Sequence, residues 1–412
     1  MNEDFLSQRP LPEGLHPDTL ALRVSVPRSG YGEHSEAVYL TSCFVQPDAA
    51  TAARRYAREQ PGYTYTRSGN PSVTAFENRL AALEGAEAAI ATSSGMAAIT
   101  LLAVALLKSG DHVVCSRAMF GSTISLLGEH LARFGVNTTF VSQTDVQAWR
   151  AAVRPQTRLL FAETPNNPLA DVCDIAALAA IAHEAGALLA IDNCFATPAL
   201  QRPLALGADL VVQSGTKFLD GQGRVMAGAV CGSRALVDEQ LRPLSKTLGM
   251  VLSPFNAWVV HKGLETLALR VRAQSAHALA LAQWLQAHAA VQRVHYPGLA
   301  SHPGHALAMA QQSGCGGAIL AFAVRAADPA QARRRAFHVI DSTRVCSIAT
   351  NLGDVRTLIS HPASTSHARL SEPERDAAGV GQGLLRLSVG LEHAPDIQQD
   401  LARGLDHCLA VA

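Results

Sequence analysis

Short apolar segments alternate with helix-like segments through the middle of the chain, and this alternation restricts the fold more than any other feature. Between residues 88 and 233 the apolar segments are AAIATSS, DHVVCS, TTFVS, TRLLFAET, ALLAIDN, ADLVVQS and GAVCGS. Helix-patterned segments such as IAALAAIAHEAG separate several of them. Strands that are apolar on both faces and alternate with helices are typical of a mostly parallel sheet covered on both sides. We therefore predict an α/β domain over residues 63–255.

The two ends of the chain differ from the middle region in composition and in hydrophobic periodicity. Residues 1–62 contain Pro and Gly turns without sustained periodicity, which predicts an arm that packs on another part of the protein. After residue 255, long amphipathic helices, one of them spanning 256–288, surround fewer strand-like segments. This pattern predicts a smaller α+β domain over 256–412, and a chain of 412 residues is long enough for both domains.

Charge and hydropathy exclude several classes of partner. Lys plus Arg and Asp plus Glu both number 34, so no overall charge attracts nucleic acid or an anionic membrane. No apolar run approaches the roughly 20 residues that cross a bilayer, and the opening segment MNEDFLSQRP is unlike a signal or transit peptide. The eight cysteines form no C-x-x-C pair, which is typical of buried thiols. We expect a cytoplasmic protein with a small-molecule partner and no metal site.

Polar residues follow the ends of three predicted strands, where ligands of open parallel sheets bind. Gly95 opens a helix whose free N–H groups favour phosphate, although ordinary helix caps have the same pattern. Asp192 ends a second buried strand, and Ser214, Thr216 and Lys217 end a third. A lysine amine, an acid for a pyridine nitrogen and a phosphate cup are the groups that pyridoxal phosphate requires. We predict pyridoxal 5'-phosphate as the cofactor.

Two other chemistries of α/β proteins fit the sequence less well. The segment GQGRVMAG has Met226 where the third glycine of a dinucleotide-binding G-x-G-x-x-G belongs, and it does not open a helix. The serine-hydrolase elbow G-x-S-x-G does not occur. Both alternatives are weakened, which favours the pyridoxal-phosphate interpretation.

Six segments resemble, in order and spacing, the Cys/Met-metabolism (trans-sulfuration) family of pyridoxal-phosphate enzymes. They are YTYTRSGNPS (63–72), ATSSGMAAI (91–99), AETPNNP (162–168), AIDNCFATP (190–198), SGTKFLDGQG (214–223) and LRLSVGLE (385–392). The resemblance extends from about residue 20 to 410. It implies the fold-type I, aminotransferase-like transferase architecture, and a homotetramer in which pairs of subunits share their active sites.

The resemblance also implies roles for the cofactor-binding residues. Lys217 would be the Schiff-base lysine and proton shuttle, and Asp192 the partner of the pyridine nitrogen. Tyr65 and Arg67 match a pair that reaches the phosphate from the neighbouring subunit. The other cofactor contacts carried over are Gly95, Met96, Ser214 and Thr216 at the phosphate and Asn167 at the phenolic oxygen.

The substrate side shows both matches and departures. Arg386 matches the arginine that binds the α-carboxylate of the amino-acid substrate, and Asn351 stands where many lyases have serine. Phe120 replaces a tyrosine of many relatives, so its ring can stack on the cofactor but cannot act as an acid or base. Methionine γ-lyases have a cysteine where this chain has Ser122, which argues against that activity. Cys194 stands where relatives often have threonine.

These departures, together with the segment NLGDVRTLISHPASTSH, predict a γ-replacement reaction. O-succinylhomoserine and sulfide would give homocysteine and succinate, as a step of methionine biosynthesis. Cystathionine γ-synthesis from cysteine, use of O-acetylhomoserine and a lyase reaction stay open as alternatives. A non-catalytic pyridoxal-phosphate-binding protein is disfavoured because the lysine, acid and carboxylate-binding positions are all occupied.

Overall fold

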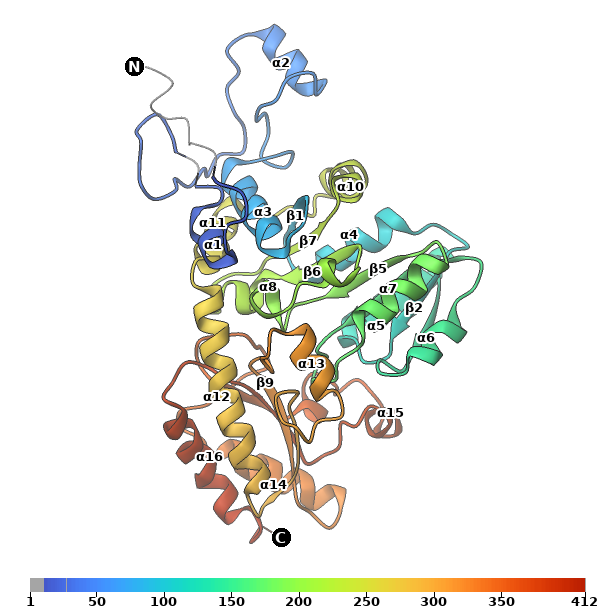
Figure 1. Cartoon of the computed structure of the whole chain (residues 1–412), viewed down its shortest axis with the longest axis vertical. Helices are drawn as coiled ribbons and strands as arrows, with labels where there is room; N and C mark the ends of the chain where they lie inside the picture. Colours follow the sequence, from blue (N-terminus) through green and yellow to red (C-terminus); the bar gives the residue numbers. More distant parts are fainter. Residues whose placement is uncertain (1–10, 27, 412) are drawn as a thin grey trace.

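The computed structural model describes residues 11–26 and 28–411. The opening segment, in which we predict no signal or transit peptide, lies outside the described residues. The molecule is elongated, with a large sheet in its upper half and a second sheet in its lower half (Figure 1). Helix α12 (Leu267–Ala287) runs from one half to the other. No helix in the described part of the chain is long and apolar enough to cross a membrane.

The large sheet has seven strands in the order β1-β7-β6-β5-β4-β2-β3. They are β1 (Ala88–Thr92), β2 (His112–Ser116), β3 (Asn137–Val141), β4 (Thr157–Glu163), β5 (Leu188–Asp192), β6 (Leu210–Ser214) and β7 (Gly228–Gly232). β7 is antiparallel to both of its neighbours, and the remaining pairs are parallel. Each of the seven apolar segments forms a strand, so the predicted mostly parallel sheet is confirmed.

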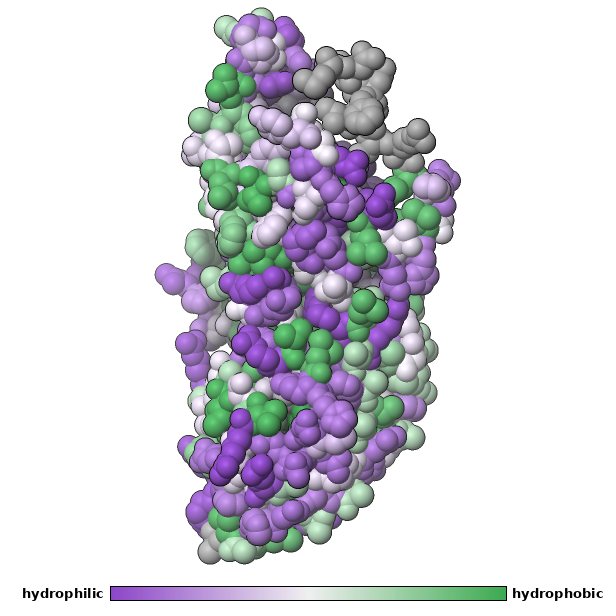
Figure 2. Space-filling model, turned by 90° about the vertical axis from the view of Figure 1, so that its left-hand side faces the viewer, coloured by the Kyte–Doolittle hydropathy of each residue, from purple (hydrophilic) through white to green (hydrophobic). Residues whose placement is uncertain are grey.

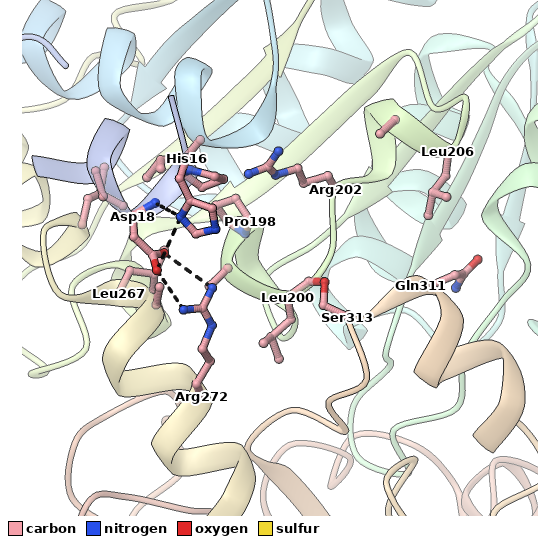
Figure 3. Close-up of a pocket in the computed structure, with 17 residues that line it drawn as sticks. His16, Asp18, Pro198, Leu200, Arg202, Leu206, Leu267, Arg272, Gln311 and Ser313 are labelled. Atoms are coloured by element: carbon pink, nitrogen blue, oxygen red, sulfur yellow. Dashed lines mark hydrogen bonds and ion pairs between the residues drawn. The ribbon is translucent and has the colours of Figure 1, made fainter. Parts of the chain in front are cut away.

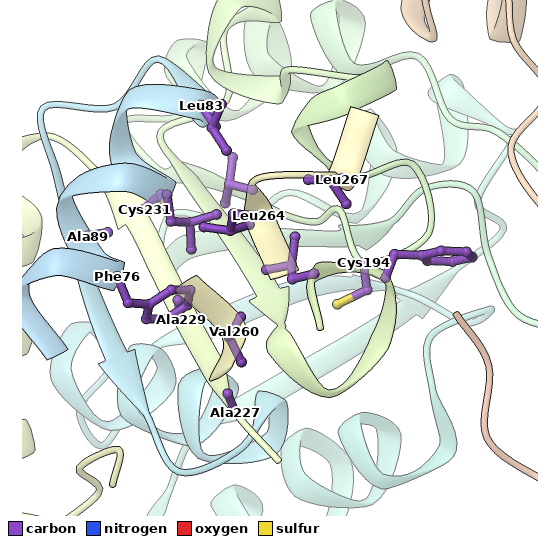
Figure 4. Close-up of a cluster of buried hydrophobic side chains, with 14 of the residues drawn as sticks. Phe76, Leu83, Ala89, Cys194, Ala227, Ala229, Cys231, Val260, Leu264 and Leu267 are labelled. Atoms are coloured by element: carbon purple, nitrogen blue, oxygen red, sulfur yellow. The ribbon is translucent and has the colours of Figure 1, made fainter. Parts of the chain in front are cut away.

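Helices cover both faces of this sheet. They include α3 (Pro71–Glu84), α4 (Gly95–Leu106), α5 (Gly121–Ser125), α6 (Val146–Ala152), α7 (Ile175–Glu184), α8 (Thr197–Leu200), α9 (Arg234–Leu236), α10 (Arg242–Leu248) and α11 (Pro254–Leu264). Short helical turns are η2 (Leu126–His130), η3 (Leu131–Phe134), η4 (Pro203–Leu206), η5 (Gly215–Leu219) and η6 (Val237–Leu241). Successive side chains of a strand point to opposite faces. Val211 accordingly packs with α3 and α11, whereas Val212 packs with α4. Figure 4 shows the first of these two cores.

The second sheet has five strands in the order β10-β11-β12-β9-β8 and is antiparallel except between β10 and β11. Its strands are β8 (Val291–His295), β9 (Ile319–Val324), β10 (Ser347–Ile348), β11 (Leu358–Ser360) and β12 (Leu384–Ser388). Its other elements are α13 (His305–Gln311), α14 (Pro329–Asp341), η7 (Pro362–Ser364), α15 (Glu372–Ala377) and α16 (Ala394–Cys408). Phe322 and Leu387 of this sheet are fully buried against residues of α12, α14 and α16.

The N-terminal region contains two short helices that the sequence did not predict, α1 (Pro17–Arg23) and α2 (Ala49–Tyr56). Helix α1 packs on α3, whereas α2 projects from the top of the molecule (Figure 1). The face over α1, α12 and α16 carries apolar residues in separate small groups among hydrophilic ones (Figure 2). The proposed divisions at residues 62 and 255 stay predictions.

The prediction of a single helix over 256–288 is wrong, because the helical conformation is interrupted between Leu264 and Leu267. The side chain of Arg270 donates to the carbonyl oxygens of Gly263 at 2.8 Å and Phe218 at 2.8 Å. The first bond satisfies a carbonyl at the end of α11 that a continuous helix would have paired internally, and the second connects α12 to η5. The break places the start of α12 beside η5.

Candidate active site

Three neighbouring strands of the large sheet end in polar residues. Glu163 and Asp192 end β4 and β5 and are paired in register, and Ser214 ends β6. Glu163 is 4% exposed and Asp192 is 8% exposed. Burial raises the pKa of both carboxyl groups, and the charge of Asp192 raises the pKa of Glu163 further. The hydrogen bond from the Cys194 N–H to Asp192 Oδ1, at 3.1 Å, favours the ionised form of Asp192. Of the two, Glu163 therefore holds a proton more readily.

Lys217 lies in η5, just beyond the end of β6. Its φ and ψ of −97° and −133° are not helical and interrupt this turn. The Lys217 Nζ donates to Asn351 Oδ1 at 2.5 Å. Burial lowers the pKa of the Lys217 amine, and the positive charge of Arg386 acts in the same direction. Both effects increase the neutral fraction of the amine, the form that acts as a nucleophile or base.

Arg386 lies on β12 of the second sheet and is 2% exposed. Its Nη1 donates to Asn167 Oδ1 at 2.9 Å, and its Nη2 donates to the backbone oxygens of Thr350 at 3.1 Å and Asn351 at 3.0 Å. Its buried Nε has no hydrogen-bond partner in the part of the chain described. Burial lowers the pKa of Arg386 to about 10. The linked residues Lys217, Asn351, Arg386 and Asn167 thus join the two sheets at one place.

A cradle of small polar groups lies at the start of α4. The Ser94 Oγ accepts from the N–H of Ala97 at 3.1 Å, while the N–H groups of Gly95 and Met96 donate to no described group. A Cβ on Gly95 would lie 3.0 Å from the Cβ of Ser214, so glycine permits this close approach. The cradle has the free donors and the helix terminus that anions prefer.

Thr216 and Met96 make the next contacts around this cradle. Thr216 Oγ1 accepts from the N–H of Ala227 at 3.1 Å. The Thr123 hydroxyl donates to the Met96 sulfur at 3.8 Å. The first bond connects η5 to the residue before β7, and the second connects the start of α4 to α5.

Phe120 precedes α5 and is held by Glu163. Its N–H donates to Glu163 Oε2 at 2.8 Å, and the residue is 41% exposed. Glu163 is a residue that the sequence analysis did not single out. The signal was present, because Glu163 ends a predicted strand as Asp192 does.

Tyr65 and Arg67 lie outside this group of contacts. The Arg67 Nη1 donates to the backbone oxygen of Lys246 at 2.6 Å, and its guanidinium carbon is 5.5 Å from the centre of the Tyr65 ring. Both side chains are exposed. Among the described residues, no hydrogen bond joins either of them to Lys217 or Asp192. Their role at the phosphate of a neighbouring subunit stays a prediction.

The comparison with protein families gives the class of the chain. The model of the family described as Cys/Met metabolism PLP-dependent enzyme matches residues 18–406. The chain belongs to this family. It is therefore an enzyme whose cofactor is pyridoxal phosphate, PLP.

Individual relatives match over nearly their whole length. The chain is 54% identical over 393 residues to an O-succinylhomoserine sulfhydrylase of Pseudomonas aeruginosa, covering 95% of this chain and 96% of the relative. It is 46% identical to an O-succinylhomoserine sulfhydrylase of Mycobacterium tuberculosis, with 96% and 97% covered. The crystal structure of cystathionine gamma synthase from Xanthomonas oryzae pv. oryzae in complex with cystathionine matches with a TM-score of 0.90 and 36% identity. That match covers 97% of this chain and 100% of the other, and it confirms the fold-type I architecture.

The residues at this site fit PLP. Lys217 supplies a buried amine whose pKa is lowered, and Asp192 supplies a buried carboxylate at the neighbouring strand end. Gly95 forms part of a cradle with unpaired N–H donors that could hold a phosphate. The unpaired Nε of Arg386, which is linked to Lys217 through Asn351, is a donor that could bind a carboxylate. Within the described ranges, no group of three or more His, Cys, Asp or Glu could hold a metal ion.

Proposed function

We propose that this enzyme exchanges the succinyl ester of O-succinylhomoserine for sulfide and releases homocysteine and succinate. The observation that carries this proposal is the 54% identity to an O-succinylhomoserine sulfhydrylase over 95% of the chain. In this reaction the bond between the γ-carbon and oxygen breaks, and succinate leaves with its electron pair. A carbon–sulfur bond forms at the same carbon, so the exchange needs no oxidant or reductant.

The proposed cofactor contacts follow from the strand ends. Lys217 bonds the cofactor through its amine, Asp192 binds the pyridine nitrogen, and the α4 cradle with Ser214 and Thr216 binds the phosphate. When bound, PLP withdraws electrons from the amino acid attached to it and makes the neighbouring protons acidic. Asn167 is placed next to Arg386 by its 2.9 Å hydrogen bond, which supports a role for both at the edge of the cofactor.

Lys217 moves the protons in this proposal. Its amine has a lowered pKa, so a neutral Nζ is available to take the proton from the α-carbon. Asn351 accepts a hydrogen from Nζ and thereby orients the lone pair of the amine. Phe120 has no hydroxyl, so its ring cannot share this task. Lys217 is thus the proposed acid and base at this carbon.

Arg386 binds the α-carboxylate of the substrate in this proposal. Both of its Nη atoms already donate to protein oxygens, whereas its buried Nε has no partner among the described residues. A substrate carboxylate would satisfy this donor with a charge-assisted hydrogen bond. The bonds through Nη fix the plane of the guanidinium and therefore the place of the carboxylate.

The choice of sulfur donor rests on Phe120. A phenolate at this position would help to deprotonate an incoming amino acid, and phenylalanine cannot do so. Sulfide is small and is already ionised in large part near neutral pH, so it requires no second carboxylate-binding group. Cystathionine γ-synthesis is the second candidate, since the cystathionine gamma synthase of Xanthomonas oryzae pv. oryzae matches with a TM-score of 0.90.

Steady-state kinetics with each pair of substrates tests the proposal. O-succinylhomoserine and O-acetylhomoserine are each combined with sulfide and with cysteine. We expect the highest kcat/KM for O-succinylhomoserine with sulfide, about 10-fold above cysteine, which corresponds to about 1.4 kcal/mol. A higher value with cysteine would make the chain a cystathionine γ-synthase, and a preference for the acetyl ester would overturn the named donor. Absence of turnover with any pair would contradict the reaction class.

We also propose that the chain forms a homotetramer, a dimer of dimers with shared sites, and works in the cytoplasm in methionine biosynthesis. The exposed positions of Tyr65 and Arg67 support shared sites, because both residues can reach a neighbouring chain. Each of the eight cysteines lies in the described part of the chain and is free, which suits a reducing compartment. Amino acids and sulfide are the expected partners, without nucleic acid or membrane.

A further inference from the structure

A second cavity lies away from the candidate active site, between α1, α3, η4 and α12 (Figure 3). Its volume is about 330 Å³, within the range of pockets that hold small molecules. None of the residues proposed to contact PLP or substrate lines it. It is therefore not an extension of the active site.

The apolar wall of this cavity is built by five leucines, Leu83, Leu200, Leu206, Leu264 and Leu267. Four of them, all except Leu206, are at most 5% exposed and belong to the core between α3, α8, α11 and the sheet. Figure 4 shows Leu83, Leu264 and Leu267 within that core. A wall made of core residues is held in place by packing, so the cavity is formed before any ligand arrives.

Each polar side chain that lines the cavity has a hydrogen-bond partner among the described residues, with one exception. Arg272 donates to Asp18 at 2.9 Å, and the hydroxyl of Ser313 donates to the carbonyl of Leu200 at 2.9 Å. Gln311 accepts from the N–H of Ile175 and donates to the carbonyl of Cys173, both at 3.0 Å. The cavity therefore offers few free polar groups to a ligand.

Arg202 is the exception. Its half-buried side chain makes no hydrogen bond or ion pair with any residue in the described ranges, and Figure 3 shows it extending toward the side of the pocket where His16 lies. Glu84 is an acid whose charge interacts with Arg202, and burial raises the pKa of Glu84 to about 7. A raised pKa reduces the charge with which Glu84 compensates Arg202.

We propose that this cavity binds a small aliphatic carboxylate, with its charged end on Arg202 and its apolar chain on the leucine wall. A guanidinium binds a carboxylate through two parallel hydrogen bonds, and the wall gains from covering apolar surface. The site does not depend on the proposed reaction, because it shares no residue with the catalytic group.

A ligand in this cavity would lie beside elements that pack against the strand ends of the active site. Leu200 lies on α8, and the neighbouring Gln201 donates to the side-chain oxygen of Asn193 at 3.0 Å and to the backbone oxygen of Thr164 at 2.9 Å. Asn193 and Thr164 directly follow the strand-end carboxylates of β5 and β4. A ligand on the leucine wall thus contacts the helix that packs against both strand ends.

Isothermal titration calorimetry on the PLP-loaded enzyme tests the site with hexanoate as the probe. Hexanol has the chain without the charge, and acetate has the charge without the chain. We expect saturable binding of hexanoate and at least about 10-fold weaker binding of either control. Hexanol lacks the charged end that contacts Arg202, and acetate lacks the apolar area that the leucines cover. Absence of saturable hexanoate binding, or equal binding of hexanol, would overturn the proposal.

Variants then locate the binding. Arg202→Met keeps the aliphatic stem and should weaken hexanoate at least about 10-fold. Ala205→Phe places a ring in the cavity and should do the same while keeping the charge. Arg133→Met, at an exposed arginine outside the cavity, is the matched control and should bind as the parent does. Unchanged binding by both cavity variants, each shown to unfold like the parent, would contradict the assignment.

Discussion

At the scale of single residues, the amide of Asn351 connects the two groups that the proposed reaction needs. Its side-chain oxygen accepts from Lys217 Nζ at 2.5 Å, and its backbone oxygen accepts from Arg386 Nη2 at 3.0 Å. The amine that moves protons and the guanidinium that binds the carboxylate are thereby held at a fixed separation. Asn351 is a positioning residue in this account.

Replacing Asn351 with alanine should lower kcat about 10-fold to 100-fold and leave the KM for the amino-acid substrate nearly unchanged. The variant loses the acceptor of Lys217 but keeps the backbone oxygen that holds Arg386. The acidic limb of the pH–rate profile should also move, since the amine loses a hydrogen-bond partner. Steady-state kinetics from pH 6 to pH 10 measures both effects.

Asn256→Ala serves as the control, because Asn256 donates to the backbone of Met226 at 3.0 Å outside the site. It should leave kcat and the pH profile unchanged. Partial recovery of kcat in Asn351→Ser would support an oxygen acceptor at this position. An Asn351→Ala variant with the parental kcat and pH profile would remove Asn351 from the account.

Residues at strand ends could be predicted from the strand pattern of the sequence, whereas residues from the second half of the molecule could be predicted only through the family resemblance. Lys217 and Asp192 follow from the rule that ligands bind at the carboxyl ends of parallel strands. Asn351 is 134 positions away from Lys217, so their contact follows only from tertiary structure. Its place, like that of Arg386, was predicted through the family resemblance. Glu163 could have been found by the strand-end rule.

At the scale of elements, a buried cluster of charges fixes the N-terminal region to α3 and α11. Glu36 accepts from Arg79 at 3.1 Å, from Lys262 at 3.0 Å and lies 3.1 Å from His261 Nε2. Arg79 is fully buried, and its second acidic partner is Glu265 at 3.3 Å. The side chain of Glu36 is thus a major compensating charge for a buried arginine.

Glu36→Gln should destabilise the enzyme by about 3 kcal/mol at pH 7, as removal of one partner from a buried ion pair does. Although burial opposes it, the hydrogen bonds from His261 and Lys262 hold the pKa of Glu36 far below its usual value. A carboxylate with a depressed folded pKa stabilises the fold above its unfolded pKa, and the stabilisation fades as the pH falls toward the folded pKa. The difference between parent and variant should therefore shrink below about pH 4.

Urea unfolding at several pH values measures this difference. Glu184→Gln is the matched control, because Glu184 pairs with Arg150 at 2.5 Å on the exposed surface. It should change the unfolding free energy little at any pH. A loss in Glu36→Gln that stays constant from pH 7 to below pH 4 would show that the charge of Glu36 is not its source.

The sequence predicted which strands and helices exist better than it predicted where they begin and end. All seven apolar segments of the middle region form strands, since each combines short length with flanking helices. The interruption between α11 and α12 could not be predicted, because it depends on a tertiary contact between Gly263 and η5. A Cβ at this glycine would lie 2.3 Å from the carbonyl oxygen of Leu219, so the close approach of η5 sets the path of the helix.

At the scale of the whole molecule, the proposed phosphate site of a single chain lacks the arginine, Arg67, that is predicted to contact the phosphate. Arg67 lies on the surface and contacts Lys246 of α10 rather than the α4 cradle. If sites are shared, Arg67 of one subunit completes the site that contains Lys217 of another. Pairing of two subunits is then required for activity.

Mixing two inactive variants tests shared sites. Arg67→Ala and Lys217→Ala chains, unfolded together and refolded, should regain about a quarter of the parental activity, because half of the random pairs are hybrids with one intact site each. Each variant refolded alone gives the baseline. Native mass spectrometry verifies that hybrids have formed, and hybrids without activity would mean that each chain contains its whole site.

Chemical trapping of the cofactor tests the central claim, the assignment of Lys217, most directly. Borohydride reduces the bond between a lysine and PLP to a stable one, and peptide mapping by mass spectrometry then locates the labelled lysine. We expect the label on the peptide that contains SGTK, with Lys217 as the modified residue. A label on Lys246 or Lys262 would contradict the account.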